Sequence, residues 1–167
     1  MTYSAFIVNP KFDVNRGSVE RAVWNFGGDW IIRRGVGKGR PYTDVPKAHR
    51  HLPVIDLPDD PREARRVLRD AIGTHVLVAV DTRDVLARRG LGIMNLDELT
   101  SGRRRIPWIF MLGNEATGLP NLWLEYADVG VTIPMAEDRP GSLNVAVAGA
   151  IVLHHLQLGA QTPASAP

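Results

Sequence analysis

The stretch from Ile109 to Leu156 limits the possible folds of this 167-residue chain more than any other segment. Its pattern predicts a buried strand, a glycine-framed turn, a short helix, a second strand that ends at Pro134, a polar loop and a largely apolar helix. An apolar strand that is buried on both faces is typical of parallel sheets covered by helices. The segment therefore brings two tight loops to the start of one long helix, and we expect the preceding residues to complete one site there.

The preceding residues alternate predicted strands with predicted helices. One helix has Ser18 as its expected N-cap, and a second begins with Asp60, Pro61 and Glu63. The segment 84–107 is interpreted as irregular up to the strand at 108–112. The other predicted strands before the C-terminal stretch are residues 2–8, 30–32, 54–57 and 75–80. This order predicts one α/β domain with a mainly parallel sheet and helices on both faces.

Composition favours a single domain without disulfide or thiolate chemistry. Hydrophobic residues make up 44% of the chain, enough to fill one core, and no cysteine is present for disulfides or cysteine-based zinc sites. Asn9 and Pro10 interrupt the apolar N-terminal run, so neither a signal peptide nor a membrane span is predicted. We therefore expect a cytoplasmic protein with a folded domain at residues 1–158 and a disordered tail at 159–167.

Basic residues gather in three places, although the formal net charge is only +2. Arginine accounts for seventeen of the twenty basic residues, and its fork of donors suits phosphate. The clusters are the glycine-rich loop 33–41, one helix face with Arg62, Arg65, Arg66 and Arg69, and the run 103–105. Each cluster fits either an RNA contact or a solvated surface, and the sequence leaves that choice open. The histidines lack carboxylate or cysteine partners at ligand spacing, so no metal site is predicted.

Three motifs in series resemble the signature of the SpoU/TrmH branch of the SPOUT RNA methyltransferases. The segment from Asn15 to Arg21, NRGSVER, is similar to the Asn-x-Gly-x-x-x-Arg motif of that family. The segment 112–120, LGNEATGLP, resembles its Gly-x-Glu-x-x-Gly turn. Ile133-Pro134-Met135, followed by SLNVAVA at 142–148, resembles its third motif. Together the motifs extend over nearly the whole chain.

The resemblance implies a fold that composition and periodicity cannot show. In this family the C-terminal segment threads through a preceding loop and makes a trefoil knot, which general topology rules would disfavour. The resemblance also implies S-adenosylmethionine as the cofactor, RNA as the partner, and a homodimer in which the arginine of one subunit faces the cofactor of the other. The expected reaction is methylation of a ribose 2′-hydroxyl in tRNA or rRNA. Because little precedes Asn15, the chain resembles the compact members without an added RNA-binding domain.

The resemblance also assigns roles to individual residues. Cofactor binding is expected from residues in or beside the knotted loops: Val80, Leu112, Gly113, Ile133, Met135 and Leu143. The expected catalytic set is Arg21, Asn15, Glu115, Ser142 and Asn144. A guanidinium keeps its proton at neutral pH, so Arg21 is expected to bind RNA phosphate and stabilise the developing alkoxide rather than act as a free base.

Some of these residues also have purely structural interpretations. Glu115 could brace its loop, and Ser142 could be only the N-cap of the last helix, with Asn144 bonded to local backbone. Trp24, beside Arg21, could stack on a base or on a partner helix. Two other functions remain open at this level. One is a catalytically silent RNA-binding dimer, and the other is a methyltransferase with an acceptor that is not RNA.

Overall fold

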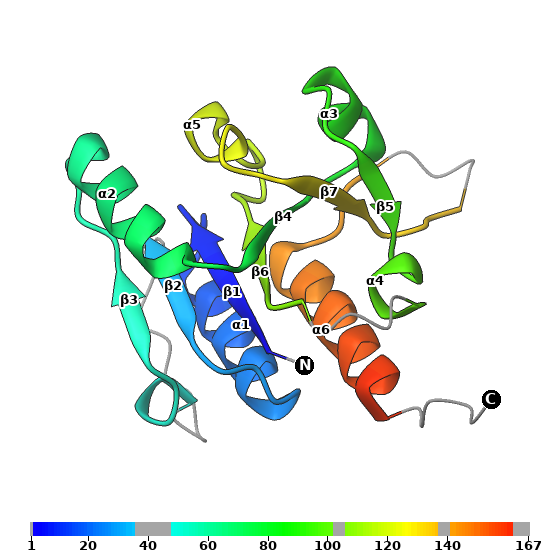
Figure 1. Cartoon of the computed structure of the whole chain (residues 1–167), viewed down its shortest axis with the longest axis horizontal. Coiled ribbons are helices and arrows are strands. Elements are labelled where there is room, and N and C mark those ends of the chain that lie inside the picture. Colours follow the sequence, from blue (N-terminus) through cyan, green and yellow to red (C-terminus); the bar gives the residue numbers. More distant parts are fainter. Residues whose placement is uncertain (1, 36–47, 102–105, 137–140, 162–167) are drawn as a thin grey trace.

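The computed structural model describes residues 2–35, 48–101, 106–136 and 141–161, which form a seven-stranded sheet with helices on both faces (Figure 1). All neighbouring strands run parallel, in the order β3-β2-β1-β6-β4-β7-β5. The strands are β1 (Tyr3–Val8), β2 (Ile31–Arg34), β3 (Val54–Asp56), β4 (Val76–Val80), β5 (Ile93–Asn95), β6 (Trp108–Leu112) and β7 (Val129–Thr132). The predicted α/β class is confirmed.

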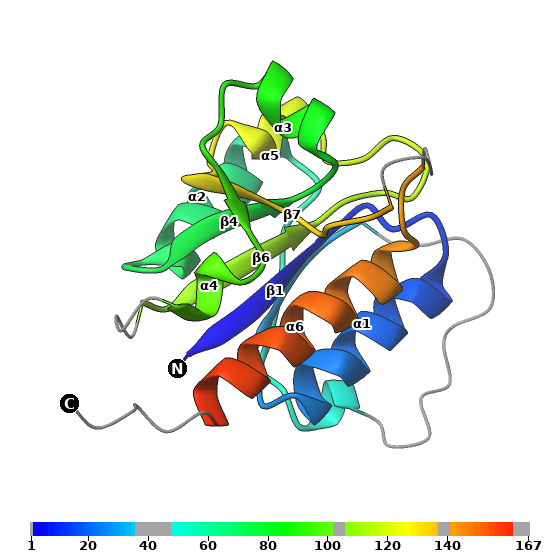
Figure 2. The same ribbon diagram turned by 90° about the vertical axis from the view of Figure 1, so that its right-hand side faces the viewer.

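Two layers of helices cover the sheet. One layer holds α1 (Asp13–Asn25), the 3-10 helix η1 (Ala48–Arg50), α4 (Glu98–Ser101) and α6 (Val145–Gln161). The other holds α2 (Pro61–Ile72), α3 (Arg83–Arg88) and α5 (Asn121–Leu124). Figure 2 shows α1 and α6 side by side on the first face. The two cores share the central strand β6, whose residues alternate between them, so burial on both faces explains its unbroken apolar run.

The helix α1 begins earlier than the sequence predicted. It starts at Asp13, and Ser18 lies inside it, where the Ser18 hydroxyl donates a hydrogen bond to the backbone oxygen of Val14 at 2.8 Å. The prediction of Ser18 as N-cap was therefore wrong. An ion pair between Asp13 and Arg16 at 2.5 Å stabilises the first turn in place of a side-chain cap. As a consequence, Asn15 lies on a helix rather than in a loop.

The segment predicted to be irregular, 84–107, contains three short elements instead. It holds most of α3, the strand β5 and the helix α4, so the sheet has seven strands rather than about six. β5 pairs along Ile93–Asn95 with residues 130–132 of β7 at the edge of the sheet. Elements of three to six residues are too short to show a period of their own, and tertiary pairing decides whether they form.

The path of β7 bears on the predicted knot. The chain that leaves β4 goes through α3 on one face, β5 at the edge and α4 on the other face before it returns as β6. β7 then enters the sheet from α5 on one face, lies between β4 and β5, and leaves to α6 on the opposite face. This places β7 inside the loop that runs from β4 to β6, as a threaded chain requires. The knot itself stays a prediction.

Several expectations concern the ends and loops of the chain. α6 continues to Gln161, so the helix includes the first residues of the predicted tail at 159–167, and the rest of that tail lies outside the described residues. Most of the glycine-rich loop 33–41 and the basic run 103–105 also lie outside them. Within the part of the chain that the structure describes, no helix is long and apolar enough to cross a membrane.

Candidate active site

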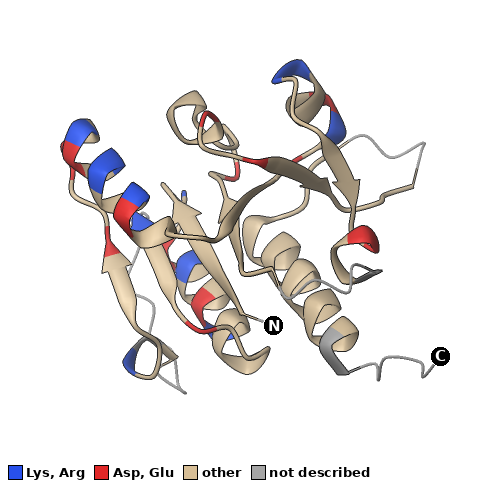
Figure 3. Ribbon diagram, viewed as in Figure 1, with Lys and Arg blue, Asp and Glu red and all other residues tan. Residues whose placement is uncertain are grey.

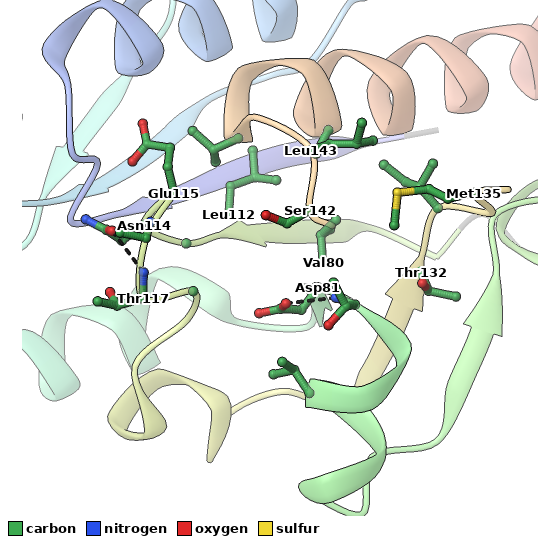
Figure 4. Close-up of a pocket in the computed structure, with 18 residues that line it drawn as sticks. Val80, Asp81, Leu112, Asn114, Glu115, Thr117, Thr132, Met135, Ser142 and Leu143 are labelled. Carbon is green, nitrogen blue, oxygen red and sulfur yellow. Dashed lines mark hydrogen bonds between the residues drawn. The ribbon is translucent and has the colours of Figure 1, made fainter. Parts of the chain in front are cut away.

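A pocket of about 330 Å³ opens at the carboxyl ends of three neighbouring strands (Figure 4). Its walls come from the residues that follow β4, β6 and β7 and from the first turn of α6. The volume lies within the range of small-molecule sites, about 300–1,000 Å³. Open α/β sheets bind ligands at this edge because the loops that follow the strands converge there. The position alone makes this pocket the first candidate for a binding site.

All six residues predicted to bind the cofactor line this pocket. They come from four separate segments of the chain, and the set is Val80, Leu112, Gly113, Ile133, Met135 and Leu143. Two of the predicted catalytic residues, Glu115 and Ser142, line the same pocket. The structure thus brings together eight residues that lie up to 63 positions apart, from 80 to 143, although their roles stay predictions.

The loop after β6 is closed by its own hydrogen bonds. The backbone amides of Asn114 and Gly118 each donate to the other residue's carbonyl oxygen, at 3.0 and 2.8 Å. The Asn114 side chain accepts from the amides of Ala116 at 2.8 Å and Thr117 at 3.2 Å, and it donates to the Asn9 carbonyl at 2.8 Å. Every polar group of this side chain is therefore used to hold the loop, which gives the pocket a rigid wall.

Glycine is required at the start of this loop by close packing. A Cβ atom built on Gly113 would lie 2.5–2.7 Å from backbone atoms of Gly118 and Leu119. Gly118 has a φ of +67°, a left-handed conformation that favours glycine. The two glycines of the predicted Gly-x-Glu-x-x-Gly turn therefore bring its two ends into contact.

A line of hydrogen bonds connects three of the predicted catalytic residues beside the pocket. The Glu115 carboxylate accepts from the side-chain amide of Asn15 and from the Lys11 backbone amide, the latter at 2.7 Å. Asn15, only 9% exposed, accepts in turn from the side-chain amide of Asn144 at 3.3 Å. The loop after β6, the helix α1 and the start of α6 are thereby linked. Glu115 does brace the loop, as its structural interpretation proposed, and it also holds Asn15.

Asn144, not Ser142, caps the last helix. The Asn144 side-chain oxygen accepts from the amides of Ala146 at 2.8 Å and Val147 at 3.4 Å, the pattern of an N-cap one residue before α6. Ser142 is exposed two residues earlier and lines the pocket. The structural interpretation of Ser142 as a cap is therefore wrong, while Asn144 is bonded to local backbone and also reaches Asn15.

Arg21 does not line the pocket of its own chain. It lies half-buried on α1, less than two turns beyond Asn15, and is absent from both the pocket wall and the shallow groove between α1 and α6. That groove is lined by polar side chains and by apolar ones from α6 and the C-cap of α1: Asn15, Ser18, Asn144 and His154, with Phe26, Ala146, Val147, Ala150 and Ile151. Trp24, 41% exposed, stacks on the ring of His51 with centroids 4.8 Å apart, so its ring is already partly engaged.

Several residues of the pocket were not among those predicted for the site. Asp81 and Thr82 follow β4, at the carboxyl end of a strand where the sequence already indicates ligand binding, although it assigned them no role. Thr132 ends β7, and the same signal could have identified it. Thr117 lies inside the glycine turn and faces the same cavity. These side chains give a mainly apolar pocket a set of polar groups.

Two arginines at the start of the glycine-rich basic loop are already occupied by carboxylates. The Arg33 guanidinium donates to both oxygens of Asp56, at 2.6 and 2.7 Å, and lies 3.2 Å from Glu20. These hydrogen bonds lower the pKa of the Asp56 carboxyl below its usual value. Arg34 pairs with Asp59 at 2.8 Å. Both guanidinium groups are therefore bound to carboxylates near β3, at the edge of the sheet.

Within the described residues, no group of histidines and carboxylates could hold a metal ion.

Comparisons with known proteins agree with this geometry. The model of the SpoU rRNA Methylase family matches residues 4–154. The SpoU methyltransferase AviRb from Streptomyces viridochromogenes is 27% identical with a TM-score of 0.67, over 94% of this chain and 59% of AviRb. AviRb has also been solved in complex with AdoMet, in a structure that is likewise 27% identical to this chain. No curated protein matches the chain.

Two more distant structures share the fold. An rRNA methyltransferase from Sinorhizobium meliloti, solved with AdoMet bound, is 22% identical with a TM-score of 0.70, over 96% of this chain and 57% of that one. The TrmH/SpoU tRNA modifying enzyme from A. aeolicus is 20% identical with a TM-score of 0.70, over 94% and 74%. This chain thus spans 59% of the length of AviRb. Because the family model covers nearly all of its residues, the chain belongs to the SpoU rRNA Methylase family.

Proposed function

We propose that this protein is an RNA methyltransferase that uses S-adenosylmethionine and methylates a ribose 2′-hydroxyl of tRNA or rRNA. One observation carries the proposal: all six predicted cofactor residues line a single pocket, beside the hydrogen-bonded line Glu115–Asn15–Asn144. The family match and the AdoMet complex of AviRb support the same activity. We also propose that the enzyme acts in the cytoplasm, where tRNA and rRNA are available as substrates.

The residues of the pocket fit an adenosyl cofactor. Apolar side chains from β4, β6 and the start of α6 can cover the flat adenine, while polar groups at the strand ends can bond its sugar and amino-acid parts. Gly113 and Gly118 let the main chain of the loop come close to a ligand, because a Cβ at Gly113 has no room and Gly118 is left-handed. The cofactor would be held by the six predicted residues, Val80, Leu112, Gly113, Ile133, Met135 and Leu143.

When bound, the cofactor supplies a methyl group on a sulfonium, and the chain supplies positioning and electrostatics. We propose that Asn144 and Ser142 orient the ribose, while Glu115 fixes Asn15 in place. Arg21 would bind the RNA phosphate and stabilise negative charge on the 2′-oxygen as its proton leaves to phosphate or water. Holding the oxygen in line with the methyl carbon, about 3 Å away, can provide much of the rate.

A homodimer would explain why Arg21 lies outside the pocket of its own chain. Val147, 48% exposed, lines the groove between α1 and α6, and two more exposed hydrophobic side chains, Val14 (51%) and Trp24 (41%), lie on α1 outside the groove lining. We propose that a second copy covers this face. Since Asn15 lines the groove and Arg21 lies on the same helix, the arginine of one subunit would then reach the pocket of the other.

Val147→Asp should convert the dimer to monomers, because it places a charge in the middle of an apolar contact that would lose its water on association. Analytical ultracentrifugation at micromolar concentration measures the change. The matched control is Ala87→Asp, which adds the same charge at an exposed position of α3 on the opposite face of the sheet. A wild-type protein that sediments as a monomer, or a Val147→Asp variant that remains dimeric, would contradict this interface.

Transfer of radioactive methyl groups from S-adenosylmethionine to total tRNA and rRNA tests the activity. Mass-spectrometric mapping of the product then locates the methyl group, and the proposal requires a ribose 2′-O-methyl nucleotide. Cofactor binding without transfer to any RNA would favour the catalytically silent RNA-binding dimer. Transfer to a small molecule or a protein, with weak and salt-insensitive RNA binding, would favour a different acceptor. A methyl group on a base would retain the RNA substrate and overturn the ribose assignment.

We propose that the arginine face of α2 contributes to RNA binding. Asp60 caps this helix as predicted, with its side chain accepting from the amides of Arg62 and Glu63. Figure 3 shows several basic segments along α2. Arg62, Arg66 and Arg69 are exposed, Arg65 is half-buried, and in the described part of the chain none of the four pairs with a carboxylate. Like charges at these spacings each cost about 0.2–0.5 kcal/mol of helix stability, and RNA phosphates would relieve that repulsion.

The double variant Arg66→Gln, Arg69→Gln should bind substrate RNA roughly tenfold more weakly near 0.1 M salt, since it removes two charges that face the phosphates. The slope of log K against log salt should fall by about 1.4–1.8, which is the value for two lost phosphate contacts. Titrations at several salt concentrations measure both quantities. Arg66→Lys, Arg69→Lys is the matched control and should restore most of the slope. An unchanged slope in the glutamine variant would show that the arginine face of α2 does not contact RNA and is only exposed to solvent.

A further inference from the structure

Asp81 presents a carboxylate oxygen to the main pocket that no described residue uses. The residue follows β4 and is half-buried, and its backbone amide donates to the Val131 carbonyl at 3.3 Å. One side-chain oxygen, Oδ1, accepts from the amide of Thr82 at 2.8 Å, which fixes the carboxylate. In the view of Figure 4 it lies between Thr117 and Thr132. The other oxygen, Oδ2, has no hydrogen-bond partner in the described part of the chain.

The opposite wall leaves room for this oxygen. A Cβ atom on Gly118 would lie 3.1 Å from Asp81 Oδ2, and Gly118 also has the left-handed backbone of the turn. Any side chain at position 118 would therefore press on the carboxylate. The glycine turn thus shapes the main chain and keeps Asp81 Oδ2 accessible to a ligand.

The charged side chains that line the described part of the pocket are all negative. Among the described residues that line it, the ionisable side chains are Asp81 and Glu115, and both are carboxylates. Glu115 is already held by the Lys11 amide and by Asn15, whereas Asp81 has a free oxygen. No lysine, arginine or histidine is part of the described lining. A ligand with a positive charge is therefore favoured there over a neutral ligand of the same shape.

The two ligands of a methyltransferase differ in that charge. S-adenosylmethionine has a permanent positive charge on its sulfonium, and the product S-adenosylhomocysteine has a neutral thioether at the same position. Charge–charge attraction falls only as the inverse of distance, and no point in a cavity of about 330 Å³ is far from its lining. Mainly apolar walls keep the screening weak, so the attraction acts across the cavity even without direct contact.

We infer that Asp81 is a specificity residue that makes the pocket favour the cationic cofactor over its neutral product. This inference rests on the proposed function, because it assumes that the pocket takes S-adenosylmethionine. If S-adenosylhomocysteine binds more weakly than S-adenosylmethionine, product inhibition is limited and the next cofactor molecule can enter the pocket. Nothing in the three motifs includes Asp81, so the role follows from its place in the fold.

The variant Asp81→Asn tests the inference, because it removes the charge and keeps the shape. Calorimetry should show binding of S-adenosylmethionine weakened about tenfold, a change of about 1.4 kcal/mol, and binding of S-adenosylhomocysteine changed by less than about twofold. Sinefungin, with a protonated amine in place of the sulfonium, should lose about as much affinity as S-adenosylmethionine. Retained binding of S-adenosylhomocysteine also shows that the variant pocket is folded.

Asp84→Asn is the matched control, since it removes the same charge from an exposed carboxylate on α3 outside the pocket lining. It should leave all three affinities unchanged. Equal weakening of all three ligands by Asp81→Asn would overturn the inference, as Asp81 would then bind a group that they share. Three unchanged affinities would overturn it as well. If the wild-type protein bound none of these ligands, the proposed function itself would fail.

Discussion

Arg21→Ala should lower methyl transfer by about a hundredfold to a thousandfold while the dissociation constant of S-adenosylmethionine changes by less than about twofold. Loss of one preorganised donor to developing negative charge has costs of this size in other enzymes. The cofactor should be unaffected, because Arg21 is absent from the lining of the pocket of its own chain, and at the partner's pocket it is proposed to contact the RNA rather than the cofactor. Single-turnover rates with saturating cofactor, combined with calorimetry, measure the two quantities separately.

Two further variants test whether the effect on methyl transfer depends on the guanidinium group of Arg21. Arg21→Lys keeps the charge but loses the fork of donors, so we expect an intermediate rate. Arg50→Ala removes an exposed arginine from the neighbouring η1 and should leave the rate near that of the wild type. A parallel loss of transfer and cofactor binding in Arg21→Ala would instead show that Arg21 binds the cofactor or stabilises the fold.

The dimer adds a second test of where Arg21 acts. Ser142→Trp puts a bulky ring at an exposed position of the pocket wall and should block the cofactor without unfolding the chain. In heterodimers of Arg21→Ala and Ser142→Trp chains, one of the two sites has an intact arginine and an intact pocket if the arginine acts across the interface. Recovered transfer in such heterodimers supports that arrangement. If each chain uses its own arginine, neither site is complete and transfer stays low.

Gly113→Ala should abolish most cofactor binding, with the dissociation constant of S-adenosylmethionine raised at least about thirtyfold. The new Cβ would lie 2.5–2.7 Å from backbone atoms of Gly118 and Leu119, and backbone cannot rotate away as a flexible side chain can. The Asn114–Gly118 hydrogen bonds would have to open, and the rigid wall of the pocket would move. Overpacking of this kind costs about 1–3 kcal/mol of stability. Calorimetry and thermal unfolding measure the affinity and the stability.

Gly92→Ala is the matched control for this substitution. A Cβ at Gly92 meets no heavy atom within 4 Å, and its backbone is not left-handed, so we expect stability and cofactor affinity close to the wild type. Normal cofactor affinity in Gly113→Ala would show that the loop after β6 is not a wall of the cofactor site. A variant that is destabilised but binds normally would limit the glycine to a folding role.

The sequence by itself determined the local features of the site. The apolar run of β6 and the glycine pair 113 and 118 are readable because burial and turn conformation constrain residue types locally. The N-cap Asp60 was readable for the same reason. Motif resemblance then selected the six residues that prove to line one pocket, although none of them is distinctive alone.

Only the tertiary structure decided which of these local features meet. Asn15 and Glu115 are 100 positions apart, yet their side chains share a hydrogen bond. Asp81 became a pocket residue because β7 takes its place beside β4 and α6 then begins over the same strand ends. Residue types restrict the conformation of their neighbours in the chain. The order of strands depends instead on pairing and burial between distant segments, so the fold was needed to place Arg21 outside its own pocket and to bring β7 and α6 to the strand end that carries Asp81.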